Sequence, residues 1–285
     1  MKKGIIPACL LLLAGCGLNR VALRSTTELL QNGAQAVYDE PDLQLAQDAL
    51  PSHLELTRVL LQNDPDNAAL LTLAAEEFNG YAFLFVEQPQ PERAKGLYLR
   101  GRDFALRALA RNPKFQNLAD RNEIDLAKVL RAAGKKDVPD LFWAAFGWAG
   151  WINLSKDSPQ ALAQLPDAVA MMRRVEELSP EFHFAGPEIF FGVYYASRPA
   201  ILGGSTDKAR RYFDRAIEMT HGEYLMDYVL EARYLAVALQ DKSLFENLLR
   251  RAQEYPPGRL PGAMLTDQAA KKEAADLLGR VDDYF

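Results

Sequence analysis

The stretch LFWAAFGWAGWI, residues Leu141–Ile152, decides the fold class. If it forms a helix, every side of that helix is apolar, so neighbouring helices must bury it on all sides or it must line an apolar cavity. Its small residues, among them Gly147 and Gly150, would let those neighbours approach closely. Trp148 and Trp151 lie three residues apart and therefore share one face. The stretch predicts a core helix inside a larger helical assembly.

Signals for helix starts and ends occur on both sides of this stretch. Asp64-Pro65 and Ser158-Pro159 each place an N-cap residue before a proline in the first helical position. Ser243 and Glu246 have the spacing of a capping box, in which a hydroxyl and a carboxylate satisfy backbone N–H groups. Gly203-Gly204 ends one predicted helix, and the residues after it start the next. No convincing run of β alternation accompanies these signals.

The signals divide the chain into consecutive helix pairs that resemble tetratricopeptide repeats. Several second helices end at the residue before a proline, which is pushed out of the helical region. An extra helix at residues 117–133 makes the intervals irregular, and a last helix at residues 267–281 caps the array. We therefore predict an all-α fold, with tetratricopeptide-like helix pairs stacked in an irregular α-solenoid over residues 41–285. The predicted pairs are residues 68–87 with 92–112, 140–154 with 160–179, 188–197 with 206–219, and 224–240 with 243–255.

The start of the chain has the pattern of a bacterial lipoprotein signal. Lys2-Lys3 precedes an apolar run at residues 5–13, which is too short to span a bilayer of about 30 Å. Leu13-Ala14-Gly15-Cys16 then matches a lipobox, whose thiol would carry the diacylglycerol. We predict a signal peptide at residues 1–15 and a lipid-anchored segment at residues 16–40. The alternative is an ordinary secretory signal with an incidental Cys16.

Composition narrows the partners and the compartment. The net charge is −5, so no basic excess exists to neutralise nucleic-acid phosphates. The chain has two cysteines, and cleavage before Cys16 would remove Cys9. The mature chain could then form neither an internal disulfide nor a thiolate metal site. Gly17 in place of an aspartate favours the outer membrane, with the domain facing the periplasm.

Three segments rich in aromatic residues, 78–87, 141–152 and 190–199, each fall on the first helix of a predicted pair. Aromatic residues at helical spacing usually pack in a core, and that is one interpretation. The other is a cleft lined by rings, because ligand sites are mostly apolar with a few orienting polar groups. The candidate ligand-binding residues are Tyr81, Phe85, Trp148, Trp151, Tyr194 and Tyr195.

Polar residues that could orient such a ligand lie near the third segment. They are His183, Glu188 and Arg198, although each is more readily explained as a solvated or satisfied side chain. The other two histidines, His53 and His221, form no pair at the i,i+4 spacing of a helical zinc site. No G-x-S-x-G elbow is present either. We predict no catalytic residue, no metal site and no cofactor.

Several short sequence motifs occur in an order that resembles a known family. They are Gly80-Tyr81-Ala82-Phe83, residues 94–102, Trp148-Ala149-Gly150-Trp151-Ile152, Ala163-Gln164-Leu165-Pro166, residues 192–199 and Leu202-Gly203-Gly204. Together with the lipobox, this set resembles the T-component of TRAP transporters, the tripartite ATP-independent periplasmic systems, also called TatT-type lipoproteins. The resemblance covers roughly residues 30 to 250.

The resemblance implies tetratricopeptide-like helix pairs and association with a periplasmic solute-binding P-component. It also implies homo-oligomers, trimers among them, with apolar clefts or pores that could pass a hydrophobic molecule or lipid onward. We therefore predict a non-enzymatic accessory component of solute uptake with an apolar cleft. A first alternative is a lipid-anchored scaffold for envelope proteins that binds no small ligand. A second is a lipoprotein enzyme of unrecognised chemistry.

Overall fold

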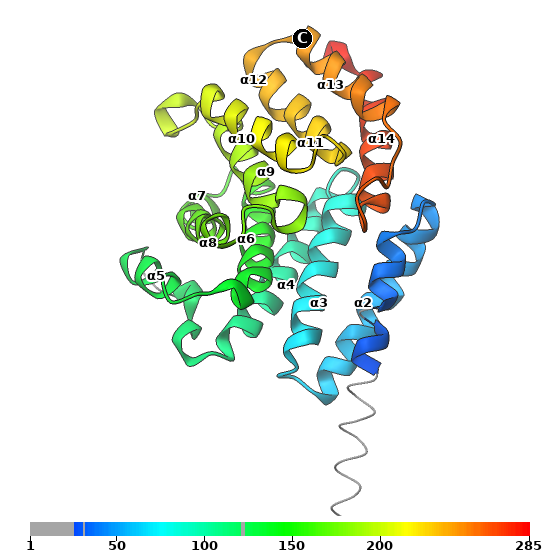
Figure 1. Cartoon of the computed structure of the whole chain (residues 1–285). Coiled ribbons are helices and arrows are strands. Elements are labelled where there is room, and N and C mark those ends of the chain that lie inside the picture. Colours follow the sequence, from blue (N-terminus) through cyan, green and yellow to red (C-terminus); the bar gives the residue numbers. More distant parts are fainter. Residues whose placement is uncertain (1–25, 31, 121–122) are drawn as a thin grey trace, which may run out of the picture.

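The computed structural model describes residues 26–30, 32–120 and 123–285, and within these ranges the chain forms helices and turns without a strand (Figure 1). The all-α prediction is confirmed for this part of the chain. Cys16 and the predicted signal peptide lie outside the described residues. The stacking of helix pairs in an α-solenoid stays a prediction.

The helices follow one another closely along the chain. Residues 26–30 and 32–38 are helical and precede α2. The longer elements are α2 (Leu43–Asn63), α3 (Ala68–Tyr81) with its π-helical continuation η1 (Ala82–Val86), α4 (Pro91–Ala110), α5 (Glu123–Leu130), α6 (Val138–Asn153), α7 (Pro159–Leu162), α8 (Leu165–Leu178), α9 (Phe182–Ala196), α10 (Thr206–Met219), α11 (Leu225–Leu230), the π-helix η6 (Glu231–Ala236), α12 (Val237–Leu239), α13 (Lys242–Glu254) and α14 (Met264–Leu278). Short 3₁₀ turns are η2 (Pro113–Phe115), η3 (Leu118–Asp120), η4 (Lys135–Asp137), η5 (Ala200–Leu202) and η7 (Val281–Asp283).

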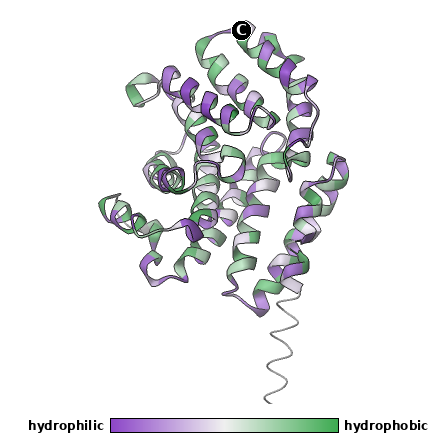
Figure 2. Ribbon diagram, in the orientation of Figure 1, coloured by the Kyte–Doolittle hydropathy of each residue, from purple (hydrophilic) through white to green (hydrophobic). Residues whose placement is uncertain are grey.

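Helix α6 lies in the middle of the molecule and packs against α3, α4, α8 and α9 (Figure 1). Its glycines allow this, as the sequence predicts. A Cβ on Gly147 would lie 2.5 Å from Asn79 Oδ1 and 2.7 Å from the backbone oxygen of Tyr98, and one on Gly150 would lie 2.8 Å from the Tyr98 ring. Outer helices such as α10 instead alternate hydrophilic and hydrophobic residues, with only one side buried (Figure 2).

Helix α3 and its continuation η1 form one long apolar stretch, Ala68–Val86. Among the described residues it is the one helix long and apolar enough to cross a membrane, and 61% of its most apolar window is buried inside the fold. It packs against α2, α4 and α6. This packing is that of a core helix.

Two predicted caps are confirmed by the hydrogen bonds of the side chains. Ser158 Oγ accepts a hydrogen bond from the N–H of Ala161 at the start of α7. Gly203 adopts the left-handed conformation (φ 85°) that ends η5, and Ser205 Oγ then accepts from the N–H of Lys208. Helix α10 has the predicted bounds.

Two other predicted caps are wrong, because a nearby Asx side chain takes the role. Asp64 follows the last residue of α2, and Asn67 caps α3 by accepting from the N–H of Leu70. Ser243 lies inside the first turn of α13, which Asp241 caps. A carboxylate or amide closer to the first free N–H groups forms the better cap.

The bounds of several helices also differ from the prediction. The predicted helix 117–133 is replaced by η3 and the shorter α5, and residues 160–179 are divided between α7 and α8. Helix α9 begins earlier than predicted, with three left-handed residues in its first turn. Helix α2 was not predicted, although its buried residues Ala46, Leu50, Leu54 and Leu61 recur at helical spacing.

Candidate functional site

A cavity of about 700 Å³ lies between η1, α6 and α9. Each of the three aromatic-rich segments contributes to its wall. The N-terminal helix at residues 32–38 and the turn before α14 contribute on another side, so elements far apart in the chain meet here (Figure 1). The principal apolar wall residues are Phe83, Leu84, Phe142, Trp143, Phe146, Ala149, Phe190, Val193 and Tyr194.

One face of α6 supplies a continuous strip of the wall. Phe142, Phe146, Ala149 and Asn153 recur every three or four residues, so they lie along one side of the helix. Ala149 is small, which leaves space where a larger side chain would fill the cavity. This stripe therefore contributes both rings and open volume to the wall, and η1 and α9 contribute further rings.

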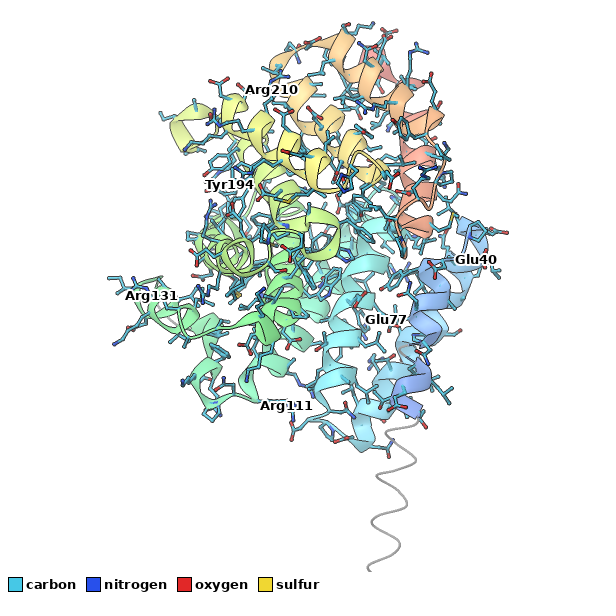
Figure 3. All side chains as sticks on the ribbon, viewed as in Figure 1. Glu40, Glu77, Arg111, Arg131, Tyr194 and Arg210 are labelled. Atoms are coloured by element: carbon cyan, nitrogen blue, oxygen red, sulfur yellow. The ribbon has the colours of Figure 1, made fainter. Side chains whose placement is uncertain are left out.

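The structure brings one of the six predicted ligand-binding residues, Tyr194, to this cavity (Figure 3). Trp148 is 1% exposed, and its Nε1 donates to Gln164 Oε1 at 2.9 Å, away from the wall. Of the others, Tyr81 is buried, and Phe85, Trp151 and Tyr195 are partly buried and pack against the core. Tyr81 and Phe85 contact each other, Tyr195 stacks on Tyr212, and Trp151 packs against buried residues of two clusters.

The three predicted segments reach the cavity, but mostly through residues on another face of each helix than the predicted ones. Successive residues on a helix are turned by about 100°, so a shift of two positions moves a side chain to the other side. The aromatic wall residues that were not predicted include Phe83, Phe142, Trp143 and Phe146. The signal that could have found them is the stripe of Phe142, Phe146 and the small Ala149, since small residues beside rings leave space.

His183 is the most unusual polar residue of the wall. It adopts φ 48°, and Phe184 and Ala185 after it are also left-handed, at 58° and 57°. The imidazole ring lies 4.8 Å from the Trp143 ring and 5.5 Å from the Phe142 ring, measured between centroids. Burial lowers the pKa of His183 to about 4, so the ring is neutral near pH 7.

A polar cluster lies at another part of the wall. The Tyr98 hydroxyl donates a hydrogen bond to Glu87 Oε2. Arg233 lies 3.8 Å from Glu87 and 3.1 Å from Glu273. Burial lowers the pKa of Lys156, which also lines the cavity, and the positive charge of Arg233 lowers it further. The charges of this cluster largely balance one another.

A second polar group faces the cavity from α3. Burial raises the pKa of Glu76 to about 7, although the hydrogen bond from Tyr38 opposes that shift. Glu77, the next residue of α3, pairs with His53 of α2 and accepts a hydrogen bond from Thr57. These contacts connect the N-terminal helix, α2 and α3 beside the cavity.

Of the remaining predicted polar groups, Arg198 lines the cavity and Glu188 does not. The Arg198 guanidinium lies 4.5 Å from the centre of the Tyr194 ring. Glu188 accepts a hydrogen bond from Arg215 Nε at 2.8 Å, between α9 and α10. Burial raises the pKa of Glu188, and its pairing with Arg215 opposes that shift. Glu188 therefore joins two helices.

Comparison with known proteins identifies the family. A family model described as TAtT, TRAP transporter T-component, matches residues 39–285. The chain belongs to this family. A protein of Treponema pallidum (strain Nichols), described as an uncharacterized protein, is 28% identical over 312 aligned positions, which cover 98% of this chain and 95% of the relative.

Membership makes the chain a TRAP transporter T-component, which is a transporter component and not a known enzyme. The family implies a membrane or envelope association and association with other TRAP components. Within the described residues, no group of three His, Cys, Asp or Glu side chains could hold a metal ion. The cavity of this T-component has an aromatic, largely apolar wall with polar groups at several places, which is the usual form of a small-molecule site.

Proposed function

We propose that this T-component is a periplasm-facing lipoprotein, lipidated on Cys16 and held at the outer membrane. It assists a TRAP-type uptake system by binding the periplasmic solute-binding P-component. The lipobox and the family support this proposal. Homo-oligomers, trimers among them, and the stacking of tetratricopeptide-like pairs belong to the same proposal.

The cavity carries the second half of the proposal, which is the binding of a hydrophobic small molecule or lipid. Its volume of about 700 Å³ lies in the range of ligand sites. Burying apolar ligand surface there would be favourable by about 25 cal/mol per Å². Of the predicted residues we retain Tyr194 as a ligand contact, and we add Phe142, Trp143 and Phe146 from the wall.

Exposed apolar side chains mark an edge at which a ligand could enter. Leu162 and Leu202 both line the cavity and are 45% and 60% exposed. Ile201, beside Leu202, is 92% exposed. The cavity wall thus continues into apolar surface between α7 and η5.

The proposal is tested by extracting the full chain from the cell envelope and analysing it by native mass spectrometry with lipid extraction. Wild type is expected to carry an apolar molecule. Ala149→Phe, which places a ring inside the cavity, should lose it, whereas Ala127→Phe adds the same bulk on the exposed surface of α5 and should keep it. Retention of the molecule by Ala149→Phe would place its site elsewhere.

The alternative function is a lipid-anchored scaffold for envelope proteins without a small ligand. The exposed side chains of Ile201 and Leu202 favour it, because exposed apolar residues often mark protein contacts. In the same experiment, a wild-type chain that gains mass only when the P-component is added would favour the scaffold over the ligand carrier.

A further inference from the structure

His183 projects a polar ring into the cavity from a strained turn. It lines the wall, and it is the first of three consecutive left-handed residues, none of them glycine. Each such residue costs about 1–2 kcal/mol, and such strain clusters at functional sites. The turn is held by its neighbours, since the Phe184 ring stacks on Tyr224 at a centroid distance of 4.6 Å. The fold therefore presents the imidazole at a fixed place.

Neither ring nitrogen of His183 makes a hydrogen bond to any described residue. A buried imidazole normally has a partner, and His53, for comparison, pairs with Glu77. A neutral imidazole offers one donor and one acceptor. A ligand with a single group that donates or accepts would therefore find an unused partner in the wall.

The surroundings of His183 favour an uncharged group on that ligand. Its ring contacts are aromatic, with Phe142, Trp143, Phe182 and Phe184. Burial alone lowers the pKa of His183, so no charged side chain acts on it appreciably. The same desolvation would penalise an ionised ligand group at this place.

We propose that the cavity binds an apolar molecule with one uncharged hydroxyl or carbonyl group, and that this group hydrogen-bonds to His183. The proposal rests on the ligand-binding half of the proposed function and names the ligand class. A carboxylate head would instead be expected at Lys156 or Arg198, which also line the cavity.

The test uses the full chain with Cys16→Ser, so that no lipid is attached and no detergent is needed. Diphenylhexatriene, which has no polar group, reports occupancy of the cavity by its fluorescence. Dodecanol, dodecane and dodecanoate then compete with it at neutral pH, where the carboxylate is ionised. Dodecanol is expected to displace the probe at the lowest concentration.

Variants of His183 connect this preference to the imidazole. His183→Phe should weaken dodecanol binding about 10-fold and leave the probe unchanged. His183→Asn keeps a donor, an acceptor and the left-handed backbone, so it should restore most of the affinity. His221→Phe is the matched control, because His221 is also left-handed (φ 54°) but exposed and outside the wall.

Each of the other outcomes would overturn one part of the proposal. If His183→Phe binds the probe and dodecanol as wild type does, the role of His183 is wrong and the cavity stands. Tighter binding of dodecanoate by wild type would overturn the uncharged head, and that comparison needs no variant. If wild type fails to bind the probe, the ligand-binding function itself fails.

Discussion

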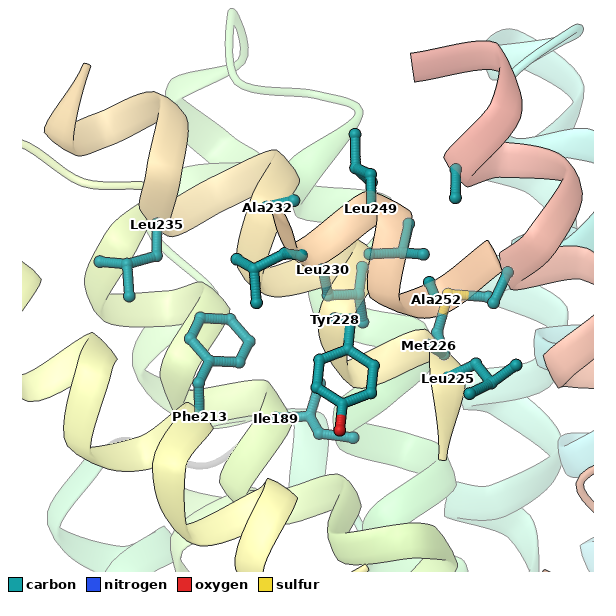
Figure 4. Close-up of a cluster of buried hydrophobic side chains, with 14 of the residues drawn as sticks. Ile189, Phe213, Leu225, Met226, Tyr228, Leu230, Ala232, Leu235, Leu249 and Ala252 are labelled. Atoms are coloured by element: carbon teal, nitrogen blue, oxygen red, sulfur yellow. The ribbon is translucent and has the colours of Figure 1, made fainter. Parts of the chain in front are cut away.

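Two regions of the molecule have similar apolar side chains and pack them differently. Around α10, α11, α13 and α14, side chains such as Phe213, Tyr228 and Leu249 fill a core and are 0% exposed (Figure 4). Around α6 and α9, the rings of Phe146 and Tyr194 surround a cavity of about 700 Å³. Aromatic content alone therefore does not decide whether an apolar region is filled.

The difference comes from where the small residues lie and from one strained turn. On one side of α6, Gly147 brings the backbone against α3 and α4. On the other side, Ala149 is too small to reach across to α9. The left-handed residues from His183 to Ala185 form the first turn of α9, at the wall. In the filled core, by contrast, Phe213 fits closely against Gly192, whose Cβ would lie 2.9 Å from its ring.

The largest expected effect tests this comparison directly. Phe213→Ala should lower the free energy of unfolding by about 3–5 kcal/mol, because it leaves a void in a filled core. Phe146→Ala should cost about half as much, since part of its ring already faces open volume and loses fewer contacts. Urea unfolding measures both variants. Equal losses would contradict the distinction between the two regions.

The next effect concerns the close contact on the other side of α6. Gly147→Ala should cost about 2–3 kcal/mol, because its Cβ would lie 2.7 Å from the backbone oxygen of Tyr98, which cannot move easily. Gly96→Ala in α4 is the control, since no atom lies within 4 Å of its Cβ. It should be neutral or stabilising by up to about 1 kcal/mol. A thermal melt that places both variants at the wild-type midpoint would refute the close contact.

A smaller effect concerns the pH dependence of stability, which should differ between a carboxyl group at the cavity wall and one on the surface. Burial raises the pKa of Glu76 from 4.5 to about 7 in the folded chain. A carboxyl with a raised folded pKa stabilises the protein fully below its unfolded pKa, and this contribution is lost as pH rises from about 4.5 to about 7. Glu76→Gln removes this titration, so its stability relative to wild type should rise by about 1–2 kcal/mol between about pH 5 and about pH 8.

The control for Glu76 is Glu254→Gln at an exposed site on α13. This variant shows how far the same substitution alters unfolding at a site away from the cavity. Urea unfolding of the three chains at both pH values gives the comparison. A stability difference for Glu76→Gln that does not change with pH would contradict the raised pKa of Glu76.

The sequence predicted the fold class and the segments of the candidate site from local patterns. The apolar run of α6 must be buried by neighbours or line an apolar cavity, and its glycines allow close neighbours, so both features follow from residue type. Which face of α6 lines the cavity does not follow from residue type, because Trp148 and Trp143 look alike in the sequence. Only the packing of α4 against one side of α6 and α9 against the other decides that Trp143 faces the cavity.

The turn at His183 could not be predicted for a related reason. Three left-handed residues without glycine contradict local preference, and only the stacking of Phe184 on Tyr224 and the contacts with α6 hold them. The predicted cap at Ser243 failed differently, since Asp241 competes for the same free N–H groups. In that case the competing residue was visible in the sequence.

The smallest expected effect concerns the helix caps at the edge of the filled core, where Asp241 competes with Ser243. Ser205→Ala should cost about 1 kcal/mol, because the Ser205 hydroxyl accepts from the N–H of Lys208 at the start of α10. Ser243→Ala should cost less than about 0.5 kcal/mol, since Asp241 provides the cap of α13 and Ser243 is exposed. Urea unfolding of both variants measures the difference. A larger loss for Ser243→Ala would mean that α13 begins later than Lys242. Ser243 and Glu246 would then form the predicted capping box.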